Sequence, residues 1–294
     1  MKRILKTYSI QKTSAIAAIL FLLTLQSYSQ PAKPLKSGYA PVNGLKMYYE
    51  VYGEGKPLVL LHGSFMTINT NYGMLIPELS KNRKVIAVEF QGHGRTADIE
   101  RPFSFENFAD DVAGVLKFLK IDSTDIMGYS LGGGVALQIA IRNPQLVKKL
   151  IIASAPFKFE GWSAETRGVF PMIKPEFFER TPIKQAYDSL APDPKHWPQF
   201  VNKLVQMVNT PYDFTEKVSS LKNPVLFIFG DSDGILPEHV AEMFRLAGGV
   251  RNGDLTALPN SQLAILPATS HTGLFAHADW LLSMIPAFLN APVK

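Results

Sequence analysis

The chain has 294 residues, of which 46% are hydrophobic and 19% charged, and this composition excludes an intrinsically disordered protein. The formal net charge is +5, but four basic residues, Lys2, Arg3, Lys6 and Lys12, lie within the first 29 residues, which contain no acidic residue. Without that stretch the net charge is +1, which excludes the long-range positive field of a nucleic-acid-binding protein. The chain has no cysteine, which excludes disulfides, thiol catalysis and thiolate metal sites.

Residues 1–29 have the pattern of a signal peptide. A basic start is followed by an apolar run, Ala15–Leu25, and then by a small-polar-small triplet at 27–29 that fits a signal-peptidase site before Gln30. The run is well short of the ~20 residues that a membrane-spanning helix needs. We therefore expect an exported protein, periplasmic or extracellular, with no stable membrane insertion after cleavage. An uncleaved membrane anchor and a buried core helix are the alternatives.

The remaining chain alternates between two hydrophobic patterns. Continuous apolar runs predict strands buried on both faces, at 57–61, 84–90, 125–129, 149–153, 224–229 and 262–266. Helical spacing of apolar residues predicts helices at 105–119, 131–142, 237–246 and 279–289. Asn43-Gly44, between apolar segments, predicts a hairpin turn. This alternation predicts an α/β fold with a mostly parallel sheet and helices on both faces.

The alternation stops between residues 155 and 221. This region is rich in proline and aromatic residues, and its helical pieces, such as Pro198–Val208, have no strands between them. We interpret residues 155–221 as a small, mainly helical cap insertion, whose aromatic residues form its own core and roof an apolar pocket. The fold core then consists of residues 30–154 and 222–294.

The segment Gly128-Tyr129-Ser130-Leu131-Gly132 matches the pattern G-x-S-x-G, between an expected strand and an expected helix. So sharp a turn forces the serine into a strained backbone conformation, which is tolerated when its neighbours carry no Cβ. The turn places the hydroxyl above the carboxyl edge of the sheet, at a helix N-terminus that favours developing negative charge. We predict that Ser130 is a nucleophile; the alternative is a chance serine in a glycine-rich turn.

A serine nucleophile needs a base, and the base needs an acid that orients it. Asp231 and Asp233 follow the strand expected at 224–229. The second lies one step further into the loop, from which it can reach over the sheet edge, while the first is placed to cap the turn. We predict Asp233 as the acid and keep Asp231 as the alternative. The same loop resembles the start of a calcium loop but lacks the terminal Glu, so no metal site is predicted.

Six histidines are available as the base. His271 follows the last expected strand, and the chain order serine, aspartate, histidine is the one that accompanies this turn in its usual fold. His277 is the rival, but its place before the last helix favours a capping or solvated residue. His196, in the insertion, and His239, on an expected surface helix, are interpreted as surface residues. We predict His271 as the base.

The segment His62-Gly63-Ser64 follows the strand expected at 57–61. In this architecture that loop supplies one backbone N–H to an oxyanion hole, and the residue after the nucleophile supplies the other. We therefore predict the N–H groups of Ser64 and Leu131 as the donors, and interpret His62 as a structural brace of the loop.

Residues 92–97 fit the dinucleotide pattern G-x-G-x-x-A after a strand. The following residues do not begin a helix, so the helix N-terminus that would bind a phosphate is absent. We interpret the segment as a structural loop and predict no nicotinamide or flavin cofactor.

Five segments together resemble the α/β-hydrolase family over about 37–288: LLHGS at 60–64, FQGHGRT at 90–96, MGYSLGG at 127–133, FGDSDGILP at 229–237 and ATSHTG at 268–273. The resemblance implies hydrolysis through an acyl-enzyme and a cap inserted before the acid-bearing strand. Glu89-Phe90-Gln91 departs from the family, many of whose members have Asp and then Arg or Pro before the glycine, which affects the expected pocket wall and not the triad. The serine excludes the dehalogenases and epoxide hydrolases of this fold, which use Asp, and the motif lacks the tryptophan of proline iminopeptidases.

The predicted function is hydrolysis of a carboxylic ester or lactone, a small molecule with an apolar portion, of which a macrolide-type lactone is one candidate. Carbon–carbon bond hydrolysis of diketones and cofactor-free perhydrolysis use the same triad and are the alternatives. A non-catalytic binding protein is a further alternative, against which the intact triad argues. Fold alone does not decide between these reactions.

Overall fold

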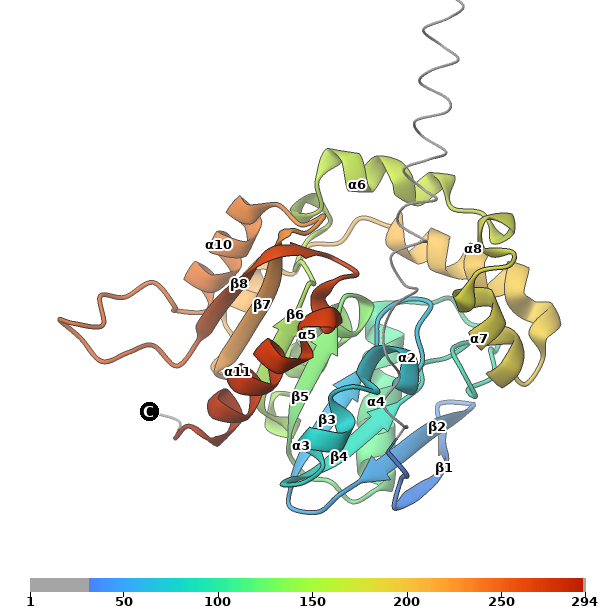
Figure 1. Cartoon of the computed structure of the whole chain (residues 1–294), viewed down its shortest axis with the longest axis horizontal. Coiled ribbons are helices and arrows are strands. Elements are labelled where there is room, and N and C mark those ends of the chain that lie inside the picture. Colours follow the sequence, from blue (N-terminus) through green and yellow to red (C-terminus); the bar gives the residue numbers. More distant parts are fainter. Residues whose placement is uncertain (1–31, 293–294) are drawn as a thin grey trace, which may run out of the picture.

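Eight strands form one sheet in the computed structural model, which describes residues 32–292 (Figure 1). The strands are β1 (Lys36–Val42), β2 (Leu45–Tyr52), β3 (Lys56–Leu61), β4 (Arg83–Val88), β5 (Thr124–Tyr129), β6 (Val147–Ala153), β7 (Val225–Ser232) and β8 (Gln262–Ser270). Their order across the sheet is β1-β2-β4-β3-β5-β6-β7-β8. The pairs β1–β2 and β2–β4 are antiparallel, and every other neighbouring pair is parallel. The predicted fold class is confirmed.

The hairpin between β1 and β2 forms at the predicted turn. Asn43 and Gly44 have φ values of 47° and 83°. These left-handed conformations at both central residues match the right-handed twist of the two strands, and Asn and Gly adopt them more readily than other residues. The hairpin adds the two antiparallel strands to one edge of the parallel sheet.

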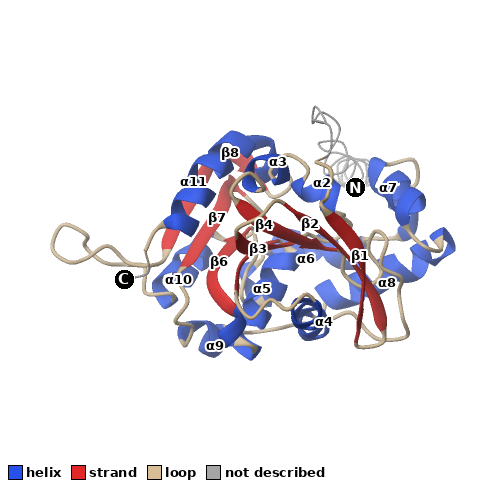
Figure 2. Cartoon of the chain, turned by 90° about the horizontal axis from the view of Figure 1, so that it is seen from below, coloured by secondary structure: helices blue, strands red, loops and turns tan. Residues whose placement is uncertain are grey.

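Helices cover both faces of the sheet (Figure 2). One face carries α4 (Phe105–Phe118), α5 (Leu131–Arg142) and α10 (Pro237–Leu246), and the other carries α2 (Ile68–Tyr72), α3 (Ile76–Leu79) and α11 (Ala278–Asn290). The side chains of β3 show why helices have to pack on both faces of the sheet. Val59 and Leu61 are buried in one hydrophobic cluster, and Leu58 and Leu60, which alternate with them, in the other. Within residues 32–292, no helix is both long and apolar enough to cross a membrane.

The segment between β6 and β7 contains helices and no strand of the sheet. In chain order its elements are η2 (Phe159–Gly161), α6 (Ala164–Val169), η3 (Phe170–Met172), η4 (Pro175–Phe178), α7 (Pro182–Leu190), η5 (Pro194–His196), α8 (Trp197–Val208) and α9 (Thr215–Ser219). Figure 1 shows α6, α7 and α8 over one edge of the sheet, and we call residues 155–208 the cap. The last helix of the segment, α9, instead packs against α5 and α10.

Aromatic residues of the cap pack around one side chain from the loop after β3. Phe178, Trp197 and Phe200 place their rings 4.7, 6.2 and 5.8 Å from the ring of Phe65, which belongs to the loop after β3. Tyr187 stacks on Phe200 at 5.1 Å. The aromatic cluster is therefore both the core of the cap and its contact with the carboxyl edge of the sheet.

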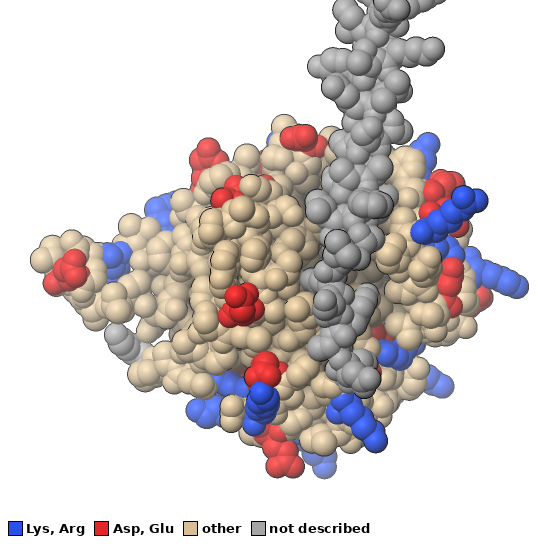
Figure 3. Space-filling model, in the orientation of Figure 1, with Lys and Arg blue, Asp and Glu red and all other residues tan. Residues whose placement is uncertain are grey.

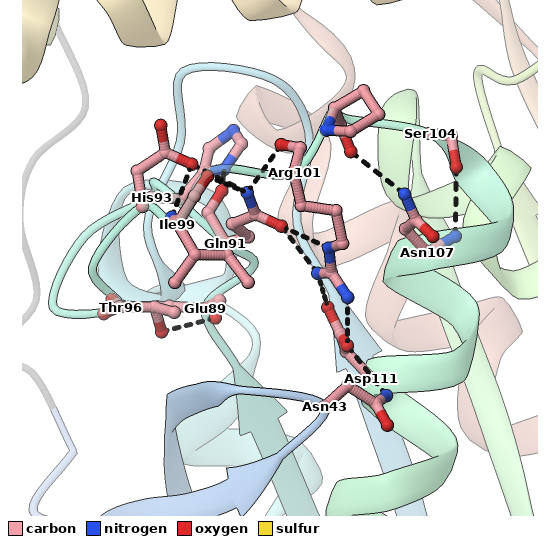
Figure 4. A network of polar contacts seen from close by, with 12 residues as sticks. Asn43, Glu89, Gln91, His93, Thr96, Ile99, Arg101, Ser104, Asn107 and Asp111 are labelled. Atoms are coloured by element: carbon pink, nitrogen blue, oxygen red, sulfur yellow. Dashed lines mark hydrogen bonds and ion pairs between the residues drawn. The ribbon is translucent and has the colours of Figure 1, made fainter.

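A half-buried arginine holds the loop after β4 in place (Figure 4). Arg101 donates to the side-chain oxygen of Gln91 through Nε and Nη2, at 2.9 and 2.6 Å, and to both carboxylate oxygens of Asp111 in α4. Asn43 of the hairpin turn donates to the same carboxylate at 2.9 Å. The network joins the hairpin, the loop and α4, because a planar guanidinium can satisfy two acceptors at once.

The G-x-G-x-x-A segment encloses a carboxylate of its own chain. Glu89, which is fully buried, accepts the backbone N–H of Arg95 at 2.7 Å and pairs with the Arg95 guanidinium at 2.8 Å. Burial raises the pKa of Glu89, and the charge of Arg95 opposes that shift. A Cβ on Gly94 would lie 2.4 Å from the carboxylate, so only glycine fits there. No helix follows until α4 begins at Phe105.

The prediction that His239 is a surface residue is wrong. Its side chain on α10 is buried, and Nε2 accepts the backbone N–H of Phe157 at 3.2 Å. Burial lowers the pKa of His239 to about 4, so the ring is neutral at pH 7. The reason is non-local: the segment that leads into the cap crosses α10 and covers the face that sequence alone would leave in water.

Candidate active site

Ser130 lies between β5 and α5 in a strained backbone conformation, with φ 51° and ψ −115°. Its N–H donates to the carbonyl oxygen of Ala153 at the end of β6, at 2.9 Å, and its own carbonyl accepts from Gly133 and Gly134 in the first turn of α5. A non-glycine residue in this region costs roughly 1–3 kcal/mol. These three bonds hold the serine in that conformation.

The glycines around Ser130 are required by close backbone contacts. A Cβ on Gly128 would lie 2.1 Å from the carbonyl oxygen of Gly132, and a Cβ on Gly132 would lie 2.0 Å from that of Leu61 in β3. Both distances are far below van der Waals contact. The first turn of α5 therefore lies directly against the ends of β3 and β5.

The structure brings Ser130, His271 and Asp233 into one hydrogen-bonded chain. The distance from His271 Nε2 to Ser130 Oγ is 3.0 Å, and that from His271 Nδ1 to Asp233 Oδ1 is 2.9 Å. A carboxylate can only accept, so Nδ1 carries the proton and Nε2 is free to accept from the hydroxyl. Ser130 and His271 are half-buried, while the side chain of Asp233 is 1% exposed.

Asp233 remains a carboxylate although it is buried. Burial, the largest single influence, would raise its pKa, but the charge and the hydrogen bond of His271 act together with two further hydrogen-bond donors in the opposite direction, and the pKa is lowered. The N–H of Ile235 also donates to Oδ1, at 3.3 Å. The hydroxyl of Ser154, at the end of β6, contributes in the same direction. A negative charge is therefore available behind the imidazole.

Asp231 has a different environment. It is exposed, and its two oxygens accept the N–H groups of Ala268 and Thr269 in β8, at 2.9 and 3.1 Å. Those hydrogen bonds lower the pKa of Asp231. They also explain why β7 and β8 continue to residues 232 and 270, beyond the expected ends at 229 and 266: the carboxylate bridges the two strands across an irregularity between Gly230 and Ser232.

The loop after β3 reaches the same edge of the sheet. His62 is fully buried; its Nε2 accepts the N–H of Phe90 at 3.2 Å, and its Nδ1 donates to the carbonyl of Gly63 at 2.8 Å. Burial lowers the pKa of His62 to about 4, so it is a neutral brace. The N–H of Ser64 has no acceptor within residues 32–292, and the N–H of Leu131, first in α5, has none within its helix.

Aromatic rings flank the imidazole of His271. Trp162, at the start of the cap, lies edge-on with its ring centre 5.4 Å away, and Phe170 packs against Trp162 at 5.5 Å. The ring of Tyr129 also lies 5.4 Å from the imidazole. Sequence reasoning did not single out Trp162, Ser154 or Tyr129 as site residues. The position of Ser154 directly after β6, and of Tyr129 at the end of β5, would have indicated that both lie at the same edge of the sheet as Ser130.

Two further histidines lie elsewhere. His196 is exposed on η5, and His277 stacks on Trp280 at 4.3 Å where α11 begins. Within residues 32–292, no group of three or more His, Asp and Glu side chains is arranged to hold a metal ion.

The comparisons with known proteins agree with this fold. The family model described as alpha/beta hydrolase fold matches residues 56–201. A pimeloyl-[acyl-carrier protein] methyl ester esterase of Aliivibrio fischeri (strain MJ11) is 28% identical over 270 residues, which are 83% of this chain and 97% of the relative. A 2-hydroxymuconate semialdehyde hydrolase of Pseudomonas sp. (strain CF600) is 38% identical over 114 residues, which are 37% of this chain and 40% of the relative.

Two solved structures share the fold. The enol-lactonase from Burkholderia xenovorans LB400 has a TM-score of 0.66 at 21% identity, covering 86% of this chain and all of that one. A meta-cleavage product hydrolase from Pseudomonas fluorescens IP01 has a TM-score of 0.66 at 24% identity, covering 87% and 98%. The protein is a hydrolase, and its chain belongs to the α/β-hydrolase fold family.

The contact between α5 and β3 can be tested with two glycines. Gly132→Ala places a methyl group into the carbonyl of Leu61, and overpacking of this kind typically costs ~1–3 kcal/mol or more. We expect a clearly lower Tm. Gly168 in α6 has no atom within 4 Å of a built Cβ, so Gly168→Ala should raise stability by roughly 0.5–1 kcal/mol. Thermal unfolding of both variants measures the difference, and an unchanged Tm in Gly132→Ala would contradict the contact.

Proposed function

We propose that the protein cleaves a carboxylic ester or lactone through an acyl-enzyme on Ser130. The observation that carries this proposal is the hydrogen-bonded chain Ser130–His271–Asp233, with distances of 3.0 and 2.9 Å. In this proposal His271 is the base, Asp233 orients it, and the N–H groups of Ser64 and Leu131 form the oxyanion hole.

The proposed reaction has two halves. Ser130 Oγ attacks the carbonyl carbon while its proton moves to His271 Nε2, and Asp233 stabilises the imidazolium that forms. The carbonyl oxygen gains a negative charge and accepts hydrogen bonds from the two backbone N–H groups; one such donor is typically worth ~3 kcal/mol in the transition state. The C–O bond then breaks, and Nε2 returns the proton to the leaving alcohol. Water attacks the acyl-enzyme in the same way, releases the acid and restores the serine.

Two observations support an ester or lactone with an apolar portion. The ring of Trp162 beside His271, with Phe170 packed against it, offers an apolar surface to the group bound at the serine. The relative that matches along 83% of this chain is described as a methyl ester esterase. No cofactor is part of this chemistry, because each proton transfer is carried by His271.

Carbon–carbon bond hydrolysis is the second candidate, favoured by the 38% identity to a semialdehyde hydrolase over 114 residues. A screen separates the two: p-nitrophenyl esters of increasing chain length and lactones on one side, a vinylogous diketone acid on the other. Turnover of the diketone well above that of every ester and lactone would reject the ester proposal and leave the serine mechanism in place.

We predict that Ser130→Ala abolishes hydrolysis while the protein remains folded. Nucleophile and base act as a unit, so His271→Ala should lose about as much, near the ~10⁶-fold found for such triads. Steady-state rates and circular dichroism measure the two properties, and a fluorophosphonate probe should label the wild type and not Ser130→Ala. A folded Ser130→Ala variant with normal turnover would disprove the mechanism.

The two aspartates provide a matched pair. Asp233→Asn presents the wrong hydrogen-bonding face to His271 and should lower kcat by ~10⁴-fold with little change in Tm. Asp231→Asn should keep kcat and lower Tm, because one of the two backbone N–H groups of β8 loses its carboxylate acceptor. The pKa of Asp231 is depressed in the folded state, so its contribution to stability is present at neutral pH and is lost as the pH falls through that lowered pKa. If the two variants exchange phenotypes, Asp231 is the acid.

We further propose that residues 1–29 direct export and are removed, so that the mature protein begins at or near Gln30 in the periplasm or outside the cell. The basic start, the short apolar run and the triplet at 27–29 support this proposal. Intact-mass analysis of protein expressed with its native leader in an exporting host tests it. A membrane-bound product that retains Met1 would favour an uncleaved anchor.

A further inference from the structure

Tyr129 connects the base to a central strand of the sheet. It is the last residue of β5, directly before Ser130, and its side chain is 2% exposed. Its hydroxyl donates a hydrogen bond of 2.8 Å to the backbone carbonyl of His271. The two residues are 142 positions apart in the chain, and β6 and β7 lie between their strands in the sheet.

The backbone of His271 needs such a support. It follows β8, which is the last strand of the sheet and pairs only with β7. The ladder between these strands ends at the pair Ser232–Ser270, so residue 271 lies just beyond the last strand pairing. An edge strand of this kind is among the less constrained parts of a sheet.

The ring of Tyr129 is fixed from two further directions. A Cβ on Gly63, in the loop that precedes Ser64, would lie 2.8 Å from the ring, so the loop rests directly on it. Phe275, in η6 (Leu274–His277), packs edge-on against the same ring at 5.0 Å. One side chain therefore touches the loop of the proposed oxyanion hole and the segment that carries the base.

The hydroxyl of Tyr129 is protonated at neutral pH and is therefore available as a donor. Burial, reinforced by the carboxylate of Asp233, raises the pKa of Tyr129 far above its ordinary value. The carbonyl of His271 can only accept, so the direction of the bond is fixed.

We infer that Tyr129 is a positioning residue for the reaction at Ser130: its hydroxyl holds His271 against the nucleophile, and its ring supports the loop that carries the Ser64 N–H. The inference rests on the proposed serine mechanism and extends it. Without the hydroxyl, the imidazole keeps its chemistry but loses the backbone contact that fixes its distance from Ser130 Oγ.

Tyr129→Phe tests the inference, with Tyr52→Phe as the matched control. Phenylalanine keeps the ring that fills the space, so the fold should be retained, which circular dichroism verifies. Tyr52 in β2 is also 2% exposed, and its hydroxyl donates to Glu50, on the far side of the sheet from β8. Each variant therefore loses one buried tyrosine hydrogen bond, and only the first loses a contact to His271.

The measurements are Tm, kcat and KM on a p-nitrophenyl ester, and the rate at which a fluorophosphonate labels Ser130. We expect both variants to lower Tm. Only Tyr129→Phe should lower kcat and the labelling rate, by roughly 10- to 100-fold, since misplacement of a catalytic group by about 1 Å can cost 10²-fold. KM should stay unchanged, because the hydroxyl does not contact substrate in this arrangement.

Two results would overturn the inference: a labelling rate for Tyr129→Phe equal to that of the wild type, or an equal fall in both variants. The latter would mean that any loss of buried stability slows the reaction. Failure of the wild type itself to be labelled, with unchanged turnover in Ser130→Ala, would reject the proposed function and this inference with it. A labelled wild type beside an unaffected Tyr129→Phe rejects the inference alone.

Discussion

The contact between the first turn of α5 and the end of β3 constrains the whole site. With a built Cβ of Gly132 only 2.0 Å from the carbonyl oxygen of Leu61, the helix and the strand are as close as their backbones allow. Leu61 leads into the loop that carries Ser64, and Gly132 follows Ser130 and Leu131. This backbone contact therefore sets how closely the loop that carries the Ser64 N–H approaches the turn that carries Ser130 and Leu131.

Backbone strain is concentrated at the same edge. Among the non-glycine residues with positive φ in the described chain, Phe65, Ser130, Ser154 and Ala268 lie at the carboxyl ends of β3, β5 and β6 and within the last part of β8. Each such conformation costs on the order of 1–3 kcal/mol and persists only where neighbouring contacts hold it. Those contacts are visible: the N–H of Ser154 bonds to Ile228 in β7, and the N–H of Ala268 to Asp231. Burial of the two hydrophobic clusters in the rest of the fold offsets the free-energy cost of these strained residues.

Local pattern was sufficient to predict most of the fold. Continuous apolar runs identify the inner strands because both their faces are buried, and the glycines of G-x-S-x-G identify the turn because only they permit it. The sequence also predicted that Ser130, Asp233 and His271 follow strands whose carboxyl ends lie at one edge of the sheet. In the structure these three side chains are hydrogen-bonded to one another there, and their catalytic roles stay predictions.

What the sequence did not predict depends on contacts between distant segments. The ends of β7 and β8 depend on Asp231 reaching across to β8, and the burial of His239 depends on the path of the chain into the cap. No periodicity encodes either contact. Tyr129 stood inside the recognised motif, yet its partner is the backbone of a residue 142 positions away, which a motif cannot specify.

The aromatic cluster of the cap has a consequence for exchanging the cap between related enzymes. Phe65 belongs to the core in sequence but to the cap in packing, with Phe178 and Trp197 among its ring neighbours. The boundary between the two modules therefore runs through the loop next to Ser64 and not only through the cap's two connections to the sheet. A chimera that exchanges residues 155–208 for the cap of a relative would leave Phe65 with foreign neighbours and disturb the loop beside the serine. Cap and loop have to be exchanged together.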